Sequence, residues 1–512
     1  MALGWKLHGD GKTLGPGDVV APDERLSWGR TAGLGAQHVV AMFGATFVFP
    51  LIMGLNPQLA IMMSGIATIV FLLIVNGKVP SYLGTSAAFV GGAAAVYAQG
   101  GTPQQVTGAI LVAGVVLALV GVFIHFIGAA ALTKVLPPVV TGAVVMLIGF
   151  NLAPVVANIY WPQDQWIALA TMTVTILLAT ILPGFWGRVS VLLGLVFGYV
   201  ASWLADLLTG PITAYNAGTG EVDTHDRVNW DGVVSAPWFG FPPATDLAND
   251  VVGWHLPDIK LTFVLLMLPA VIALVAENAG HVKAVEEMTG ADLDPMMGRA
   301  IAADGVGTII ASSVGGSPTT TYAENIGVMA STRVYSTAAY YAAAIVAIVF
   351  GLSPKFGALV SAVPGGVLGG ITVVLYGMIG LLGAKIWVEN KVDFSRPINL
   401  VPVAAGIIIA IGDTSLNISS TFSLAGIALG TIVVIAAYHL VAWLMPESMR
   451  EANFGTATIA SPPGVQSLDN LGFAEDYGLR GRRVLGRTED GHLIVEDRPD
   501  LEQGDEQPRV DA

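Results

Sequence analysis

Cysteine is absent from this chain of 512 residues, and charged residues are scarce. The missing thiols exclude disulfides, thiolate nucleophiles and cysteine metal sites. Charged residues make up 12% of the chain, against roughly 25% in a typical soluble domain, while hydrophobic residues make up 54%. This composition excludes an ordinary water-soluble globular protein and indicates a membrane protein with several spans.

Apolar stretches long enough to cross a bilayer recur along the chain. A membrane-spanning helix needs roughly 20 predominantly apolar residues, and about fourteen segments approach this length between polar breaks. Seven of them precede a long polar loop, at 33–53, 57–76, 80–97, 106–127, 134–153, 165–183 and 188–208. Seven follow it, at 258–280, 294–314, 317–332, 335–352, 357–383, 396–412 and 421–445. The predicted fold class is therefore an all-α polytopic membrane protein.

The same pattern divides the chain into five parts. Residues 1–30 are polar and lack the apolar core of a cleavable signal peptide, so we expect a cytoplasmic tail. Residues 31–208 and 257–446 each contain seven spans, and 209–256 form an external loop. The last part, 447–512, has 14 acidic and 7 basic residues, which gives half of the net charge of −14. It is predicted to be a mostly disordered cytoplasmic tail.

Basic residues fall in alternate short loops, as the positive-inside rule requires of a multi-pass protein. Most lie on the side of the two tails: Lys78, Lys134, Arg188, Lys283, Arg299, Arg333, Lys385, Lys391 and Arg396. Three lie on the opposite side: Arg227, Lys260 and Lys355. Both termini are therefore expected to be cytoplasmic.

Two of the segments are predicted to be broken. Residues 80–89 and 315–322 are rich in glycine, proline and β-favouring hydroxyl residues, and we expect short strands in them. Irregular backbone at membrane depth is tolerated only where protein buries it or where it lines a cavity. Each break is third in its set of seven, and 137–149 resembles 364–377 in the fifth of each set. An inverted repeat with paired breaks is typical of secondary transporters whose site lies near the midplane.

Charged side chains within apolar segments are costly and are therefore candidates for function. Glu277 and His281 are four positions apart, on one helical face, where they could also merely bridge helices. Glu324 follows the second break, where an acid also stabilises a helix N-terminus. Asp304 lies among small residues, and both a helix-packing hydrogen bond and a proton relay are open for it.

Other chemistry receives less support from the sequence. His38, beside Gln37, could be a ligand contact or a hydrogen-bonding core residue. The Glu277/His281 pair alone does not predict a metal site, because no His-Glu-x-x-His helix and no cysteine accompanies it. An intramembrane enzyme or a channel is the alternative class, but neither a nucleophile motif nor a ring of pore residues is present. We therefore expect a protein that is not an enzyme.

The stretch Glu324–Arg333 resembles the signature of the nucleobase-ascorbate transporter family. Four further stretches carry the same resemblance: Gln37-His38, Tyr82–Ser86, Ala276–His281 and Arg333–Thr337. The resemblance covers about residues 30–446 and is strongest to bacterial uracil permeases. It implies fourteen spans in two inverted repeats, a core and a gate domain, often a homodimer, and a place in the bacterial inner membrane.

The resemblance also implies roles for individual residues. The substrate-binding positions would be Glu277, Glu324, Ala87, Ala323, Tyr322 and Tyr376. Proton coupling would involve His281, Glu277 and Asp304. Supporting positions would be Gln37, His38 and Asn325.

Three positions depart from the uracil permease pattern and leave the substrate open. Ala87 replaces an aromatic residue after the first break, and Ala323 replaces a glycine. Asp304 is similar to the xanthine and urate branch, whereas Glu324 is similar to the pyrimidine branch. We expect uracil import by proton symport, with xanthine or a broader pyrimidine range as the alternative. No cofactor is expected, and a proton is preferred to sodium because Glu277, His281 and Glu324 are titratable.

Overall fold

The computed structural model describes residues 4–15, 18–128, 136–216, 221–249, 251–419, 422–446, 482–487 and 493–497. The chain forms two units, at 1–443 and 444–512. In the second unit, β9 (Arg482–Arg487) pairs with β10 (Leu493–Asp497) in antiparallel orientation. The remainder of the predicted C-terminal tail, like Lys134, lies outside the described residues.

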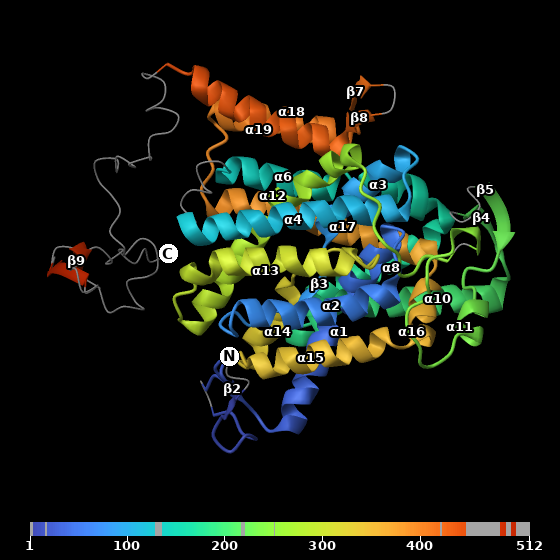
Figure 1. Cartoon of the computed structure of the whole chain (residues 1–512), viewed down its shortest axis with the longest axis horizontal. Helices are drawn as coiled ribbons and strands as arrows, with labels where there is room; N and C mark the ends of the chain where they lie inside the picture. The colour runs from blue at the N-terminus through green and yellow to red at the C-terminus, as the bar shows by residue number, and fades with distance from the viewer. Residues whose placement is uncertain are drawn as a thin grey trace, which may run out of the picture. The chain divides into compact units, whose positions relative to one another are not determined.

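The first unit consists mainly of helices (Figure 1). Before the long loop these are α1 (Trp28–Ile52), α2 (Pro57–Ile74), α3 (Val90–Ala98), α4 (Pro103–Ile127), α6 (Pro138–Phe150), α7 (Ala153–Val155), α8 (Gln165–Ile181), α9 (Gly184–Arg188) and α10 (Ser190–Thr209). The loop carries β4 (Ile212–Asn216), β5 (Glu221–His225) and α11 (Asp231–Ser235). After it come α12 (Leu261–Thr289), α13 (Asp294–Ser312), α14 (Ala323–Thr332), α15 (Thr337–Gly351), α16 (Pro354–Ser361), α17 (Gly365–Glu389), α18 (Pro397–Ile411) and α19 (Gly426–Leu444).

Short strands and irregular turns complete the unit. The strands are β1 (Lys6–Leu7), β2 (Glu24–Arg25), β3 (Leu83–Thr85), β6 (Thr319–Thr321), β7 (Ser415–Ser419) and β8 (Phe422–Ala425). A 3₁₀ turn, η1 (Ala87–Phe89), precedes α3, and a π-helical stretch, η2 (Val156–Tyr160), follows α7. The two predicted breaks therefore do contain strands.

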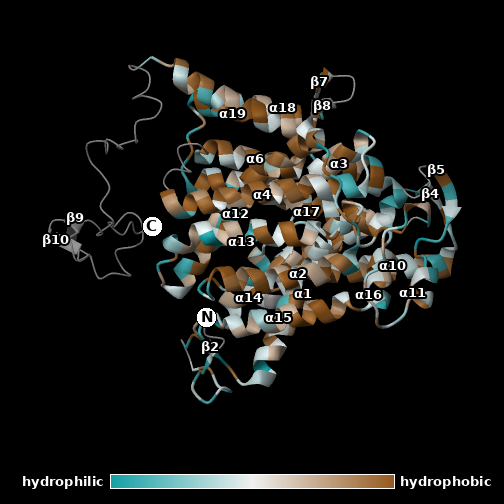
Figure 2. Cartoon of the chain, in the orientation of Figure 1, coloured by the Kyte–Doolittle hydropathy of each residue, from teal (hydrophilic) through white to brown (hydrophobic). Residues whose placement is uncertain are grey.

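Within the described residues, eight helices are long and apolar enough to cross a membrane. The bent pair α15 and α16, which meet at 82°, would make a ninth. Helical residues occur in all fourteen predicted segments, although several are too short or too irregular to count as spans by themselves. The helices are brown along most of their length in Figure 2, and polar residues gather towards their ends and in the connecting loops.

One predicted segment is wrong in its extent. Residues 357–383 were expected to form a single span, but α16 ends at Ser361 and α17 begins at Gly365. Pro364 is the N-cap of α17, and proline disfavours helical backbone in the residue before it. The helix therefore restarts at this point, and the first part of the segment is the bent continuation of α15.

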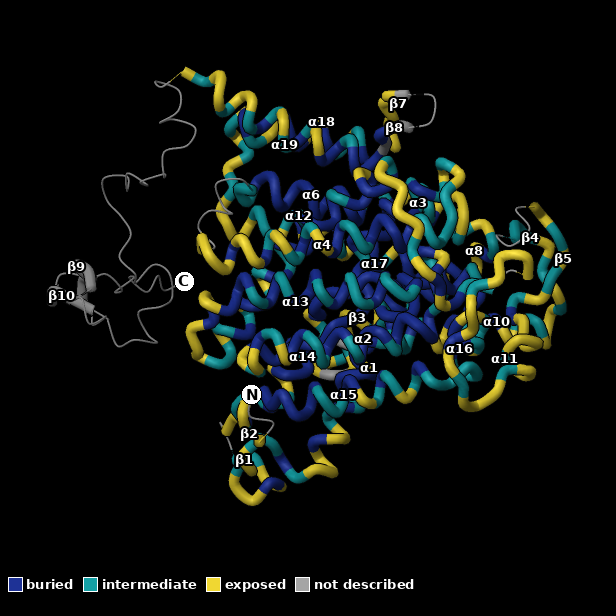
Figure 3. The backbone as a smooth tube through the Cα atoms, viewed as in Figure 1, coloured by how far each residue is buried: buried dark blue, intermediate teal, exposed yellow. Residues whose placement is uncertain are grey.

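The most extensive helix contacts fall into two groups. In the first group α13 packs on α4 and α2, α15 packs on α1 and α2, and α12 packs on α4. In the second group α17 packs on α6 and α8, while α8 packs on α10 and α6 on α18. Buried backbone runs through the middle of the helices in Figure 3, and exposed residues lie mostly at their ends and outer faces.

The two breaks meet as an antiparallel pair, β3 with β6, in the register Leu83 to Thr321 and Thr85 to Thr319. At one end of each strand, a backbone amide donates a hydrogen bond to a threonine of a neighbouring helix. On α2, Thr68 Oγ1 accepts from the amide of Leu83 at 2.9 Å. On α13, Thr308 Oγ1 accepts from the amide of Thr319 at 3.1 Å. The matching arrangement in the second helix of each set supports the inverted repeat.

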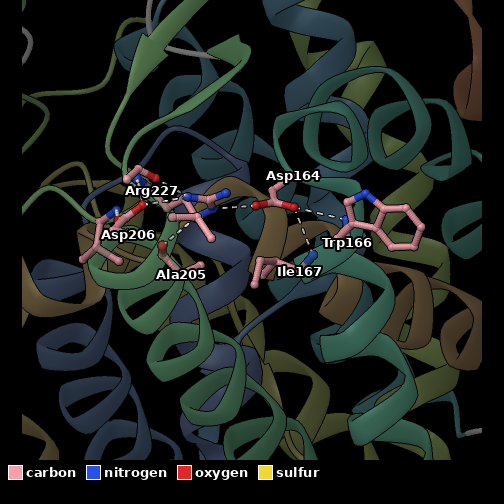
Figure 4. A network of polar contacts seen from close by, with 9 residues as sticks. Asp164, Trp166, Ile167, Ala205, Asp206 and Arg227 are labelled. Atoms are coloured by element: carbon pink, nitrogen blue, oxygen red, sulfur yellow. Dashed lines mark hydrogen bonds and ion pairs between the residues drawn. The ribbon is translucent and has the colours of Figure 1, made fainter.

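The long loop is tied to helices at one end of the bundle. Arg227 donates from Nε to Asp164, at 2.7 Å, and from Nη1 to Asp206, at 2.9 Å (Figure 4). Asp164 also caps α8 by accepting from the amides of Trp166 and Ile167. The guanidinium therefore joins the start of α8 to the end of α10.

The N-terminal segment is folded onto the opposite end of the bundle (Figure 1). Val20 forms a parallel bridge with Val334, and its amide donates to the carbonyl of Arg333 at 3.0 Å. Val20, Leu26 and Val334 form a small buried cluster. The expected N-terminal tail is thus an ordered element that covers the connection between α14 and α15.

Candidate functional site

Four polar residues of three helices lie close to one another beside the paired strands β3 and β6: Glu277, His281, Asp304 and Glu324. Glu277 and His281 lie on α12, one helical turn apart, as their spacing predicts. This helix contacts η1, β6 and α14. The short helix α14 begins at Ala323, directly after β6, so Glu324 lies in its first turn. The helix dipole stabilises an acid in the first turn, so the interpretation of Glu324 as an acid at a helix N-terminus agrees with its position.

Asp304 on α13 is fully buried and accepts a hydrogen bond from Asn278 on α12. The Asn278 Nδ2 atom lies 2.6 Å from Asp304 Oδ2. Thr321, the last residue of β6, donates to Asn278 Oδ1 at 2.9 Å and lies 2.7 Å from His281 Nδ1. The helix-packing hydrogen bond considered for Asp304 is therefore present, and it leads on to His281.

Three carboxyl groups share this region. Glu277 lies close enough to Asp304 and Glu324 for electrostatic interaction. Glu277 and Glu324 are half-buried, whereas Ala323 beside them is exposed. The three carboxylates repel each other when all of them are ionised. A bound proton, or a hydrogen-bond donor from a ligand, therefore stabilises the cluster.

Asn325 connects α14 to α1. Its Nδ2 atom donates to the backbone carbonyl of His38 at 2.9 Å and lies 3.2 Å from His38 Nδ1. The His38 ring packs on Tyr340 with 4.4 Å between ring centroids. His38 is buried, which agrees with its interpretation as a hydrogen-bonding core residue, and Gln37 beside it is half-buried.

Tyr322 fastens the two breaks to each other. Its hydroxyl donates to the carbonyl of Thr85 at 2.7 Å and accepts from Thr46 at 3.2 Å. Its ring packs on Gly84, where a Cβ atom would lie 2.5 Å from the ring. Ala87 follows in η1, half-buried and without the aromatic ring of the uracil permease pattern. Tyr322 therefore shapes the site by holding β3 against β6.

Tyr376 lies on α17 in the second helix group and lines a cavity of about 530 Å³. Within the described part of the chain its hydroxyl has no hydrogen-bond partner, and the residue is buried. The other residues that line this cavity are Gly149, Phe150, Ala153, Val156, Ala157, Trp161, Met172, Val373 and Gly377. Tyr376 therefore faces residues of α6, η2 and α8 in this cavity, and its place among the substrate-binding residues stays a prediction.

Sequence reasoning missed Asn278 and Thr321, the two residues that connect Asp304 to His281. Asn278 precedes His281 by three positions, so the spacing of polar residues on one helical face could have identified it. Thr321 carries no such signal, because its contacts come from the crossing of two breaks that are far apart in the sequence.

Apolar helices packed around two paired breaks, with one buried and two half-buried carboxyl groups beside them, define a multi-pass membrane transporter. A family model described as the permease family matches residues 29–419. The chain belongs to this family, the nucleobase-ascorbate transporters indicated by the Glu324–Arg333 signature.

Relatives extend over most of the chain. It is 43% identical to the putative pyrimidine permease RutG of Escherichia coli (strain K12), over 84% of this chain and 93% of that protein. It is 34% identical to the uracil permease of Bacillus subtilis (strain 168), over 82% and 93% respectively, and 32% identical to the uracil permease of E. coli K12, over 84% and 96%. The names of these relatives confirm the expectation of a transporter rather than an enzyme.

Solved structures support the fold. The murine Solute Carrier 26 family member A9 anion transporter, in the inward-facing state, superposes with a TM-score of 0.54. The match covers 81% of this chain and 68% of that chain at 13% identity. A likeness at this identity shows a shared arrangement of helices and says nothing of the substrate.

Proposed function

We propose that this protein imports a nucleobase, with uracil as its preferred substrate, by symport with a proton. Relatives named uracil permease and putative pyrimidine permease, which match more than four fifths of the chain, support the substrate class. The observation that carries the proposal is the gathering of Glu277, His281 and Glu324 around the crossing of β3 and β6.

The chemistry of uracil suits this site. The planar ring alternates N–H donors with carbonyl acceptors, so a carboxylate of Glu277 or Glu324 can accept from a ring N–H. Backbone amides at the start of α14 can donate to a ring carbonyl, because the first amides of a helix have no partner within it. The exposed Ala323 leaves the first turn of α14 open on this side.

Proton coupling follows from the shared polar cluster. If a proton and the substrate both favour the same state of the cluster, each raises the affinity for the other. One charge that moves through 100 mV gains about 2.3 kcal/mol, which is enough to concentrate a neutral base considerably. Alternating access would then arise from movement of the α6–α17 group relative to the group that holds the strands.

Xanthine is the second candidate substrate, and the small side chain at position 87 favours it. Ala87 leaves space where a larger ring system could fit, because the uracil permease pattern has an aromatic residue there. Asp304 also favours this candidate, because it is similar to the xanthine and urate branch of the family. Competition by xanthine therefore belongs in the test of the substrate.

The test is uptake of radiolabelled uracil into proteoliposomes under an imposed inward proton gradient, with and without excess xanthine. We expect accumulation that a protonophore abolishes and that Glu324→Gln and Glu277→Gln reduce at least tenfold. Glu286→Gln, on the same helix beyond the site, is the control and should retain transport. Accumulation of xanthine but not of uracil would assign the protein to the purine branch of the family. Accumulation driven by a sodium gradient would show that sodium, and not the proton, is the coupling ion.

We further propose the bacterial inner membrane as its location, with both termini in the cytoplasm and the loop at 209–256 outside. The alternation of basic residues supports this orientation. Single cysteines can be introduced without background labelling of other positions in this protein, because the chain has no cysteine of its own. A membrane-impermeant thiol reagent added to whole cells should label a cysteine at position 232 but not one at position 10.

A further inference from the structure

Four polar side chains form a continuous hydrogen-bonded chain from Asp304 to His281. Asn278 donates from Nδ2 to Asp304 Oδ2, at 2.6 Å, and to the carbonyl oxygen of Leu274, at 2.9 Å. Thr321 lies between Asn278 Oδ1, at 2.9 Å, and His281 Nδ1, at 2.7 Å. Asn278, Asp304 and Thr321 are all buried.

The direction of each bond in this chain is fixed by the chemistry of its ends. A carbonyl and a carboxylate both accept from Asn278, so its amide nitrogen faces them and its oxygen faces Thr321. The single hydroxyl proton of Thr321 is therefore donated to Asn278 Oδ1. It follows that Thr321 Oγ1 can only accept from His281, and that His281 carries a proton on Nδ1.

We propose that Asn278 and Thr321 are positioning residues that hold His281 in the Nδ1–H tautomer, so that the coupling proton enters at Nε2. This inference rests on the proposed proton symport. A proton delivered by water forms an N–H bond with the Nε2 lone pair and gives an imidazolium. The Nδ1–H bond to Thr321 persists throughout, and return of the Nε2 proton to water restores the neutral ring.

The surrounding charges suit this step. Glu277 lies one turn before His281 on α12, Glu324 lies on α14, and Asp304 closes the far end of the chain on α13. A negative charge on one of these acids favours the imidazolium. The ordered polarity of Asn278 and Thr321 fixes the ring with Nδ1 towards Thr321, and Nε2 is therefore the atom that takes up the proton.

The first experiment measures the tautomer in the full-length protein without any substrate. Histidine labelled with nitrogen-15 in both ring positions is incorporated, and the His281 signals are assigned by their loss in His281→Gln. We expect the wild type to show protonated Nδ1 and unprotonated Nε2 near neutral pH, and Thr321→Val to lose this preference. A wild-type ring protonated at Nε2 alone would overturn the proposal.

The second experiment compares the pH profile of uracil uptake in Thr321→Val and Thr321→Ser. Valine keeps the shape but removes the hydroxyl, whereas serine keeps the hydroxyl. We expect Thr321→Val to lower proton-driven accumulation roughly tenfold, the order of effect for a buried hydrogen bond to a charged group. The pH at which its uptake falls to half should be lower than in wild type, while uracil binding at acidic pH changes less than about threefold. Thr321→Ser should restore the wild-type profile.

The control is Thr175→Val, which removes a buried hydroxyl on α8 that, among the residues the structure describes, donates to the carbonyl of Thr171 on its own helix. An unchanged pH profile in Thr321→Val, or an equal shift in Thr175→Val, would contradict the positioning role. If the wild type neither binds nor accumulates uracil, the proposed function fails, and the tautomer of His281 still decides this inference.

Discussion

The indole N–H of Trp5 donates a hydrogen bond to the hydroxyl of Thr337, 2.8 Å away and 332 positions later in the chain. The Trp5 ring also packs edge-on against Trp28 and Tyr341. Thr337 begins α15, and the connection before it follows α14, the half-helix that carries Glu324. The N-terminal segment therefore braces the far end of the helix that begins at the candidate site.

Replacement of Trp5 by alanine should release this segment. The change removes a hydrogen bond and two aromatic contacts, which together are worth roughly 2 kcal/mol. We expect faster hydrogen exchange at the amides of Val20 and Tyr335, which form the bridge to the segment. Lys6→Ala is the control, because the Lys6–Asp23 ion pair is largely exposed and contributes little. Equal exchange rates in Trp5→Ala and wild type would contradict the bracing role.

The docking of the segment should also weaken in acid. A hydrogen bond from His8, and then one from the amide of Ala21, lower the pKa of Glu24 below its ordinary value of 4.5. Since the pKa is lowered in the folded protein, the carboxylate stabilises docking above about pH 4.5, and this contribution is lost as the pH falls through the folded pKa. Hydrogen exchange at Val20 should therefore accelerate below about pH 4.5, after correction for the intrinsic rate. In Glu24→Gln this acceleration should be absent; its persistence would assign the acid sensitivity to another group.

Arg227 should be important for stability because its positive charge compensates the negative charges of two nearly buried aspartates. The side chains of Asp164 and Asp206 are 8% and 12% exposed. Removal of one partner from a buried ion pair leaves an uncompensated charge, at a cost of roughly 3 kcal/mol. Arg227→Met should therefore lower the thermal unfolding temperature in detergent by several degrees, and Asp206→Asn in the same chain should recover part of the loss. Lys385→Met, which breaks an exposed pair with Glu389, should change it little, and equal effects of the two substitutions would refute the argument.

Local sequence was enough to predict the features that depend on local chemistry. Glycine, proline and threonine in 80–89 and 315–322 correctly predicted strands within apolar segments, and helical spacing correctly placed Glu277 and His281 on one face. The restart of the helix at Gly365 also had a local signal in Pro364, but the apolar residues on both sides of it obscured the break.

The features that were missed depend on contacts between distant segments. Thr321 meets Asn278 only because β6 crosses α12, and Trp5 meets Thr337 only because the N-terminal segment folds back over the bundle. The residues that surround Tyr376 likewise depend on how α17 packs against α6. Hydropathy and residue spacing carry no information about such pairings.

The helices α6 and α17 of the second helix group approach each other closely at Gly149, which should make this position sensitive to substitution. A Cβ atom at Gly149 would lie 2.3 Å from the backbone nitrogen of Gly380 and 2.4 Å from the carbonyl oxygen of Tyr376. These backbone atoms cannot turn aside, so Gly149→Ala must push the helices apart, at a cost of about 1–3 kcal/mol. Gly377→Ala on α17 is the matched control, because a Cβ atom there meets nothing within 4 Å.

We expect Gly149→Ala to lower the unfolding temperature in detergent and Gly377→Ala to leave it unchanged or slightly higher, since alanine favours a helix over glycine. If movement of this group provides alternating access, the helices must move as a unit, and Gly149→Ala should also slow uracil uptake in proteoliposomes. An unfolding temperature that drops equally in both variants would mean that helix flexibility, rather than the close approach at Gly149, determines the stability of this pair.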